Sequence, residues 1–207
     1  MTQWLIGTVK TSTLLILAAC LTNAVGAQAR QQAGTIAGTV RVPNGRASNA
    51  VVYLVSGRDY DVALQVEHPV IDQVSLRFLP SVIVVLPGTA VEFRNSDPVF
   101  HNVFSPGRSG EKFDLGRYPR NDSRSHTFRA DGAHVILCHI HPEMVAYVVV
   151  APTPYFAIVD GTGRFRIDDV PPGRYTIRVW HRRVRPFEEE LVVRDGKHLH
   201  LNLVLTR

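Results

Sequence analysis

The chain has 207 residues, of which 45% are hydrophobic and 20% charged, so it can bury the cores of one or two globular domains. Its formal net charge of +5 comes from 23 basic and 18 acidic residues that are scattered along the chain without a Lys/Arg block. This composition argues against an intrinsically disordered chain and against nucleic-acid binding. At most it favours docking to an acidic protein partner.

Residues 1–29 are typical of a signal peptide. Lys10 is followed by the apolar stretch Leu14 to Leu21 and by small residues, with cleavage expected after Ala27 or Ala29. An alternative is the segment L-A-A-C ending at Cys20, which resembles the lipobox of bacterial lipoproteins. We therefore expect a periplasmic or secreted protein, with a membrane anchor only if Cys20 is lipidated. No other apolar run approaches the length of a membrane-spanning helix.

Export leaves one thiol in the mature chain, because Cys20 is either removed or modified. A single cysteine cannot form an internal disulfide. Cys138 is therefore either an unused thiol or a metal ligand.

Short strands and turns flank a long central segment. We expect strands at 34–42 and 50–55 around the turn P-N-G, and further short strands after Tyr155, separated by the turns D-G-T-G and P-P-G. In the last of these, leucines at 199, 201, 203 and 205 alternate with His198 and His200, so the leucines should face a core and the histidines the outside.

Both flanking pieces resemble the carboxypeptidase regulatory-like, transthyretin-like β-sandwich. The motifs of that family open with G-x-V-x-G and A-V-V-Y-L and continue with D-G-x-F-x-I-x-x-V-P-P-G-x-Y. In the family the two halves are close in sequence, whereas here about a hundred residues separate them. The resemblance implies that residues 34–57 and 155–207 form one sandwich into which residues 70–152 are inserted. Two alternatives remain: the first strands add to the central domain, or the two domains follow one another.

The central segment is expected to contain strands at 82–86, 90–95, 123–128 and 134–138. The last two should pair across the turn A-D-G at 130–132. Residues 57–73 read as a connector. The charged stretch 106–122 carries no strand signal and is expected to be a surface loop, where partner contacts concentrate.

The segment V-I-L-C-H-I-H-P-E-M-V-A-Y at 135–147 delivers Cys138, His141 and Met144 within seven residues. Thiolate and thioether sulfur favour copper, and imidazole suits copper as well as zinc. The best further ligand is His101, which follows the polar turn N-S-D-P. Two histidines, one cysteine and a weak methionine form the type 1 copper set, whose trigonal His2Cys plane supports electron transfer.

Residues 74–151 resemble a plastocyanin-like cupredoxin: a first His followed by Asn-Val, then a strand that starts at a glycine and ends in Cys, then His and Met. The resemblance implies a Greek-key β-sandwich with one mononuclear copper ion on His101, Cys138, His141 and Met144. It also implies that Asn102 ties the two ligand loops together by hydrogen bonds. The chain departs from plastocyanin by having fewer residues between the second His and Met, so Glu143 is an alternative axial ligand.

Two further histidines lie close to the proposed ligands. His134 alternates onto the face of Cys138 and is expected to be a hydrogen-bonded core residue. His139 is adjacent to a ligand in a tight loop, where neighbouring side chains point apart. It should be exposed, either as a solvated residue or as a contact for an electron partner.

The sequence therefore predicts an all-β, exported copper protein that transfers electrons to an unidentified redox partner. It should not be an enzyme, because four protein ligands close the coordination sphere. The alternatives are a carrier or buffer that exchanges copper with another exported protein, and a metal-free structural or cell-surface β module. A nucleophilic Cys138 is disfavoured, because such thiols need a charged neighbour or a helix N-terminus.

Overall fold

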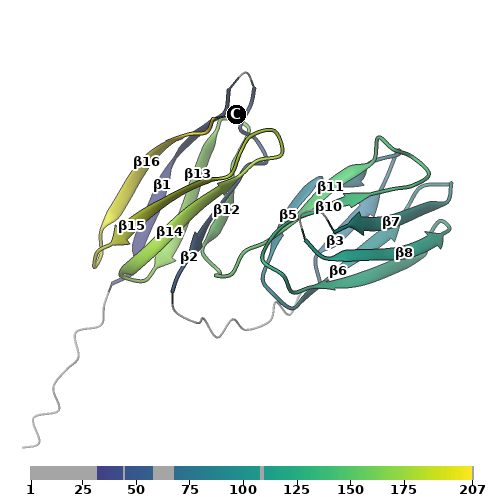
Figure 1. Ribbon diagram of the computed structural model, residues 1–207, viewed down its shortest axis with the longest axis horizontal. Coiled ribbons are helices and arrows are strands. Elements are labelled where there is room, and N and C mark those ends of the chain that lie inside the picture. The colour runs from purple at the N-terminus through teal and green to yellow at the C-terminus, as the bar shows by residue number, and fades with distance from the viewer. Residues whose placement is uncertain (1–31, 44, 58–67, 108–109, 207) are drawn as a thin grey trace, which may run out of the picture. The chain divides into compact units, whose positions relative to one another are not determined.

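The computed structural model of the chain describes residues 32–43, 45–57, 68–107 and 110–206. These residues form sixteen β-strands and no helix, which confirms the all-β class (Figure 1). Within these ranges, no helix is long and apolar enough to cross a membrane. The predicted signal peptide, Cys20 and most of the predicted connector lie outside the described residues. The end of the predicted connector is not a linker, because Val70–Gln73 form strand β3.

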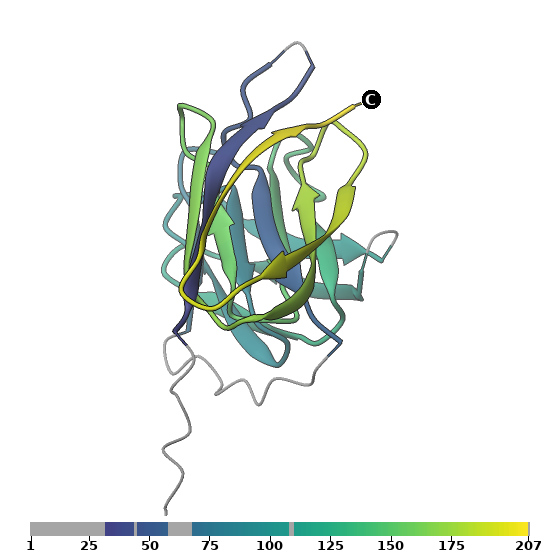
Figure 2. The same cartoon turned by 90° about the vertical axis from the view of Figure 1, so that its left-hand side faces the viewer.

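Seven strands form one unit, which we call the outer sandwich. Its two sheets have the strand orders β13-β1-β16 and β12-β2-β14-β15. Figure 2 shows β1 and β16, from opposite ends of the sequence, side by side. The strands are β1 (Gly34–Arg41), β2 (Val51–Val55), β12 (Phe156–Ile158), β13 (Arg164–Val170), β14 (Gly173–Trp180), β15 (Phe187–Val193) and β16 (His198–Val204).

The strand pairing of the outer sandwich joins the first and the last of the described strands. β1 pairs antiparallel with β13 and parallel with β16, and β2 pairs antiparallel with β12 and β14. The alternative in which the first strands extend the central domain is therefore wrong. The two ends of the intervening segment are close to each other, since the Thr153 hydroxyl donates to the Leu54 carbonyl (2.7 Å) and the Leu54 amide donates to the Tyr155 carbonyl (2.9 Å).

Gly38 permits the close approach of β1 to β16. A Cβ atom at this position would lie 1.8 Å from the carbonyl oxygen of Leu201, its partner in the parallel register. Any side chain would push the two strands apart, so glycine is required here for a steric reason.

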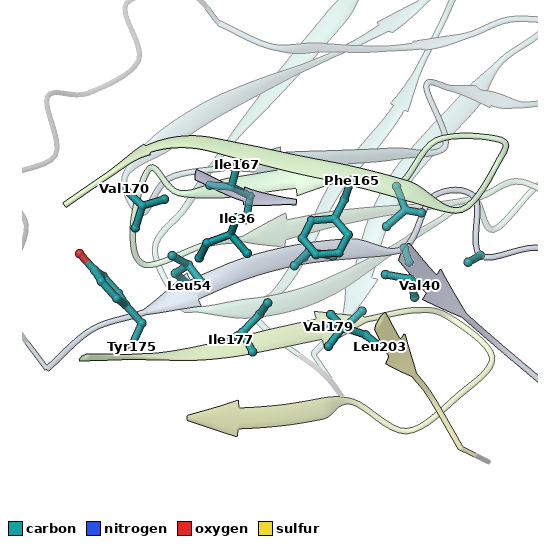
Figure 3. Close-up of a cluster of buried hydrophobic side chains, with 14 of the residues drawn as sticks. Ile36, Val40, Leu54, Phe165, Ile167, Val170, Tyr175, Ile177, Val179 and Leu203 are labelled. Carbon is teal, nitrogen blue, oxygen red and sulfur yellow. The ribbon is translucent and has the colours of Figure 1, made fainter. Parts of the chain in front are cut away.

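The core of the outer sandwich is built from both sheets. Figure 3 shows its side chains pointing toward one another between the sheets. Every fully buried member comes from residues 36–54 or 159–205. The largest include Ile36, Leu54, Phe165, Ile167, Tyr175, Ile177 and Leu203. Among the described residues, none between 55 and 155 belongs to this core.

The remaining nine strands form a second unit, the inner sandwich. Its sheets have the orders β5-β11-β10-β7-β8 and β4-β3-β6-β9. The strands are β3 (Val70–Gln73), β4 (Phe78–Leu79), β5 (Val82–Val85), β6 (Thr89–Asn95), β7 (His101–Pro106), β8 (Lys112–Tyr118), β9 (Ser123–Phe128), β10 (Gly132–Leu137) and β11 (Val145–Val150). Their buried side chains form a core drawn only from residues 71–150.

The stretch predicted to be a surface loop contains a strand. Residues Lys112–Tyr118 form β8, an edge strand that pairs antiparallel with β7. Phe113 and Leu115 alternate with exposed polar residues and pack against the inner core. Gly116, at φ +72°, breaks the alternation, so that Tyr118 is also buried. The many charged residues of this stretch predicted a surface loop, although Phe113 and Leu115 follow the alternating pattern of a short strand.

The predicted pairing of residues 123–128 with 134–138 is also wrong. Both segments are strands, but β9 pairs with β6 whereas β10 pairs with β7 and β11 in the other sheet. The backbone amides of Arg129 and Ala130, between the two strands, donate to the Glu111 carboxylate, each at 2.6 Å. These amides are therefore hydrogen-bonded without the strand-to-strand bonds of a hairpin. Crossing between the sheets lets Phe128 and Ile136 enter one core from opposite sides.

Because the two cores share no residue, we predict that the outer sandwich folds without the inner one. Deleting residues 58–152 and joining the ends with a short flexible linker should leave a β-rich domain that unfolds cooperatively. Its stability should be lower, because Val51 and Tyr53 lose their packing against Val82, Val149 and Ala151. Circular dichroism and urea unfolding measure both effects.

The matched control is Ile177→Asp in the same fragment, which places a charge in the outer core and should abolish the transition. A fragment that lacks a cooperative transition even without this substitution would show that the outer sandwich depends on the inserted segment.

Candidate metal centre

Two neighbouring strands of the inner sandwich bring the candidate ligands together. His101 is the first residue of β7, Cys138 directly follows β10, and His141 and Met144 lie in the short loop before β11. β7 and β10 are adjacent in the sheet, with Leu137 paired to Phe104. The antiparallel arrangement therefore places the start of β7 beside the end of β10.

Three of the predicted ligands converge on one point. The Nδ1 atom of His101 lies 2.9 Å from Nδ1 of His141 and 4.0 Å from Sγ of Cys138. All three donor atoms lie within 4.8 Å of one another. His101 is fully buried, Cys138 is 4% exposed, and His141 is half-buried, so solvent reaches the cluster at His141.

This donor set fits a soft cation. Two imidazole nitrogens at 2.9 Å must share either a proton or a cation, because two facing lone pairs repel. A thiol and two imidazoles that meet at one buried point form a ligand set that suits copper. A nucleophilic role for Cys138 is poorly served, because a reactive thiolate must reach its substrate and this sulfur is buried.

The two candidate axial ligands differ in burial. Met144 is 1% exposed and belongs to the same core cluster as Cys138, whereas Glu143 is exposed. The Met144 amide donates to the His141 carbonyl at 3.0 Å, which closes the loop into a tight turn. Burial therefore favours Met144, since a thioether is stable in an apolar core and a carboxylate is not.

Asn102 joins the two segments that carry the ligands. Its Oδ1 accepts a hydrogen bond from the His139 amide at 2.7 Å, and its Nδ2 donates to Oδ1 of Asp114 at 3.1 Å. Asn102 is only 2% exposed. The bond to His139 fixes the backbone between Cys138 and His141 against the start of β7.

Asp97 contacts the far side of the His101 ring and was not singled out from the sequence. Its Oδ2 lies 2.9 Å from Nε2 of His101, and the carboxylate also accepts the backbone amides of Ser75 and Leu76. Burial by itself would raise the pKa of Asp97, but the hydrogen bonds from Leu76, His101 and Ser75 outweigh it and hold the pKa below its usual value. The D-x3-H spacing could have indicated this contact, but Asp97 is also part of the turn sequence N-S-D-P, which by itself predicts only a turn.

Asn95 organises the loop that carries Asp97. Its side chain is fully buried, and its Nδ2 donates to the carbonyls of Val99 (2.9 Å) and Tyr118 (3.2 Å). Its Oδ1 accepts the Asp97 amide at 3.0 Å. The hydrogen-bonded segment N-S-D-P therefore supports the candidate ligand His101, which follows it in the chain.

Four other histidines, at 134, 139, 198 and 200, lie where the sequence predicts. His134 is fully buried, with Nδ1 accepting the Glu111 amide and Nε2 bonded to the Ala130 carbonyl. His139 is exposed, and its ring stacks on Phe104 with centroids 3.6 Å apart. His198 and His200 lie on the outer face of β16 and are exposed.

Comparison with known families identifies part of the chain. Residues 144–206 match the family model of the carboxypeptidase regulatory-like domain. The match begins at Met144 and so includes β11, which pairs with β5 and β10 of the inner sandwich. The remaining matched strands, β12 to β16, belong to the outer sandwich.

Solved structures similar to this chain include amicyanins and a copper-containing nitrite reductase. A Cu(I) structure of an amicyanin mutant is 25% identical, covering 39% of this chain and 79% of its own, with a TM-score of 0.37. A second amicyanin mutant in the Cu(I) form is 24% identical, covering 48% and 97%, with a TM-score of 0.39. A copper-containing nitrite reductase from Thermus scotoductus SA-01 is 22% identical, covering 54% and 28%, with a TM-score of 0.39. Comparison with curated proteins gave no significant match.

Outside the matched segment, the hydrogen bond from the His139 amide to Asn102 should contribute measurably to stability. Asn102→Ala leaves the His139 amide without its partner, so the free energy of unfolding of the metal-free protein should fall by about 1–3 kcal/mol. Urea unfolding measures this change. Asn202→Ala, which removes an exposed bond to Thr39, should change it by less than about 0.5 kcal/mol. Equal losses in the two variants would show that Asn102 does not hold the loops together.

Proposed function

We propose that the inner sandwich binds one copper ion through His101, Cys138 and His141, with Met144 as a weak axial ligand, and that the protein transfers electrons. The observation that carries the proposal is the convergence of one sulfur and two imidazole nitrogens within 4.8 Å at a largely buried point. Copper bound there would supply a one-electron couple between Cu(I) and Cu(II).

The protein's own residues supply a rigid frame for this ligand set. His101 and Cys138 are held by neighbouring strands, and Asn102 bonds the ligand loop to β7 at 2.7 Å. A frame that moves little between two oxidation states favours fast electron transfer, because few atoms must reorganise. The half-buried His141 is the ligand closest to solvent and is the natural exit for the electron.

Four protein ligands favour electron transfer over catalysis. Metal-dependent enzymes usually keep a coordination position open for water or substrate. Here the side chains of Met144, His101 and Cys138 are all buried away from solvent. We therefore propose a non-catalytic protein that serves a protein redox partner. The signal-peptide pattern of residues 1–29 supports the further proposal that it is exported to the periplasm or secreted.

Copper delivery is the second candidate. The half-buried His141 gives a route by which a competing acceptor can reach the ion. Reduction of the loaded protein in the presence of a Cu(I) chelator separates the two functions. Retained copper supports electron transfer, whereas rapid loss supports a carrier.

The ligand role of Cys138 can be tested by its optical signature. The Cu(II)-loaded protein should show an intense thiolate-to-copper absorption band, which Cys138→Ser removes because only this sulfur supplies the charge transfer. His139→Ala is the matched control: it changes the adjacent exposed side chain, keeps the amide bond to Asn102, and should retain the band. A band that survives in Cys138→Ser, or a wild type that stays colourless with Cu(II), would refute the proposed site.

The axial position can be tested with two further substitutions. Met144→Leu keeps the apolar volume and the trigonal plane, so copper should still bind, with an altered reduction potential. Glu143→Gln changes an exposed residue and should leave the potential and the spectrum unchanged. The opposite pattern, measured by voltammetry and electron paramagnetic resonance, would assign the axial role to Glu143.

A further inference from the structure

We propose that Asp97 is a positioning residue for the metal centre: it anchors His101 to the turn at Ser75 and Leu76 and favours the oxidised over the reduced ion. This inference rests on the proposed function. It concerns the carboxylate that contacts the non-ligating side of the His101 ring, at 2.9 Å from Nε2.

The contact assigns the roles of the two ring nitrogens. The carboxylate of Asp97 accepts a hydrogen bond from the Nε2–H group, which leaves the lone pair of neutral His101 on Nδ1. Nδ1 is the atom that faces Cys138 and His141. Since the His101 side chain is fully buried and that of Asp97 is 7% exposed, little water competes for this bond.

Asp97 is itself held by an unusual turn. Ser75 and Leu76 have φ values of +52° and +57°, and Val74 and Arg77 exchange both backbone hydrogen bonds around them. Both central residues of this two-residue hairpin are therefore left-handed, a geometry that usually requires Asn-Gly. A leucine in this conformation is strained, and such strain persists only where the surroundings enforce it.

The carboxylate of Asp97 provides that enforcement. It accepts the amides of both strained residues, Ser75 on Oδ1 and Leu76 on Oδ2. Oδ2 is also the atom that contacts His101. One side chain thus links the hairpin between β3 and β4 to the ligand at the start of β7.

The charge of Asp97 has a consequence for the redox couple. A buried anion one imidazole ring away from the ion stabilises Cu(II) more than Cu(I), because the oxidised ion carries the larger charge. Removing the charge while keeping the shape should therefore raise the reduction potential. Loss of a carboxylate behind a histidine ligand typically weakens metal binding tenfold or more.

The test compares Asp97→Asn with Asp72→Asn in the full-length protein. Asp72 accepts the Ser96 hydroxyl at 2.8 Å, so its substitution removes a nearby charge without touching His101. Asp97→Asn should keep the thiolate-to-copper absorption band. It should lower the affinity for Cu(II) at least tenfold more than the affinity for Cu(I), and a tenfold difference raises the reduction potential by about 59 mV. Asp72→Asn should produce less than a third of that shift.

A second pair of variants tests whether a change in potential comes from damage to the turn at Ser75 and Leu76. Leu76→Gly relaxes the strained turn without changing Asp97. The double variant Asp97→Asn with Leu76→Gly, measured against Leu76→Gly alone, should show the same shift in potential. Equal potentials in the Asp97 and Asp72 variants, or in the double variant and its background, would overturn the inference.

A measurement without copper separates this inference from the proposed function. In the metal-free wild type, nitrogen-15 spectra of the histidine rings should show the proton of His101 on Nε2, and Asp97→Ala should mix the two tautomers. A wild type that binds no copper but shows the Nε2 tautomer would refute the function and leave the anchoring role standing. A proton on Nδ1 in the wild type would refute the anchoring role.

Discussion

The separation of buried apolar side chains into two cores is the constraint on which this architecture depends. The outer core uses residues 36–54 and 159–205, and the inner core uses residues 71–150. An insertion is tolerated when its two ends already lie close together, because the host then needs no distortion. The bonds among Leu54, Thr153 and Tyr155 meet this requirement. Each sandwich therefore has a hydrophobic core of its own.

The candidate metal centre is surrounded by buried polar side chains that are hydrogen-bonded. Asn95, Asp97 and Asn102 come from one short stretch of chain, and each is buried. Asn95 shapes the loop, Asp97 contacts the His101 ring, and Asn102 bonds the loop that carries Cys138 and His141. Buried amides and carboxylates are costly unless they are satisfied, so their joint burial beside the ligands indicates a geometry that is held in place.

The sequence predicted the all-β class and brought out His101, Cys138 and His141 by residue type and spacing alone. Two features of the fold escaped it for a physical reason. β8 is an edge strand whose outer face carries charges, so Phe113 and Leu115 were outweighed by their neighbours. The sequence predicted a hairpin of β9 and β10 because they are adjacent in the chain. They lie in different sheets, and the backbone amides of the connecting residues donate to the carboxylate of Glu111 instead of to a partner strand.

Asp97 escaped for a different reason. In the sequence it is one residue of a polar turn, and the pairing of an aspartate with a histidine four residues later is common by chance. Its role depends on the left-handed backbone of Ser75 and Leu76, which lie in another hairpin and carry none of the usual Asn-Gly signal. Local pattern cannot predict a contact created by two segments that meet only in the fold.

X-ray absorption at the copper edge of the loaded wild-type protein tests the central claim most directly, because it counts the atoms bound to the ion. The account predicts one short copper–sulfur bond from Cys138 and two imidazole nitrogens from His101 and His141, with no second metal nearby. A shell made only of nitrogen and oxygen, or scattering from a neighbouring copper ion, would contradict it.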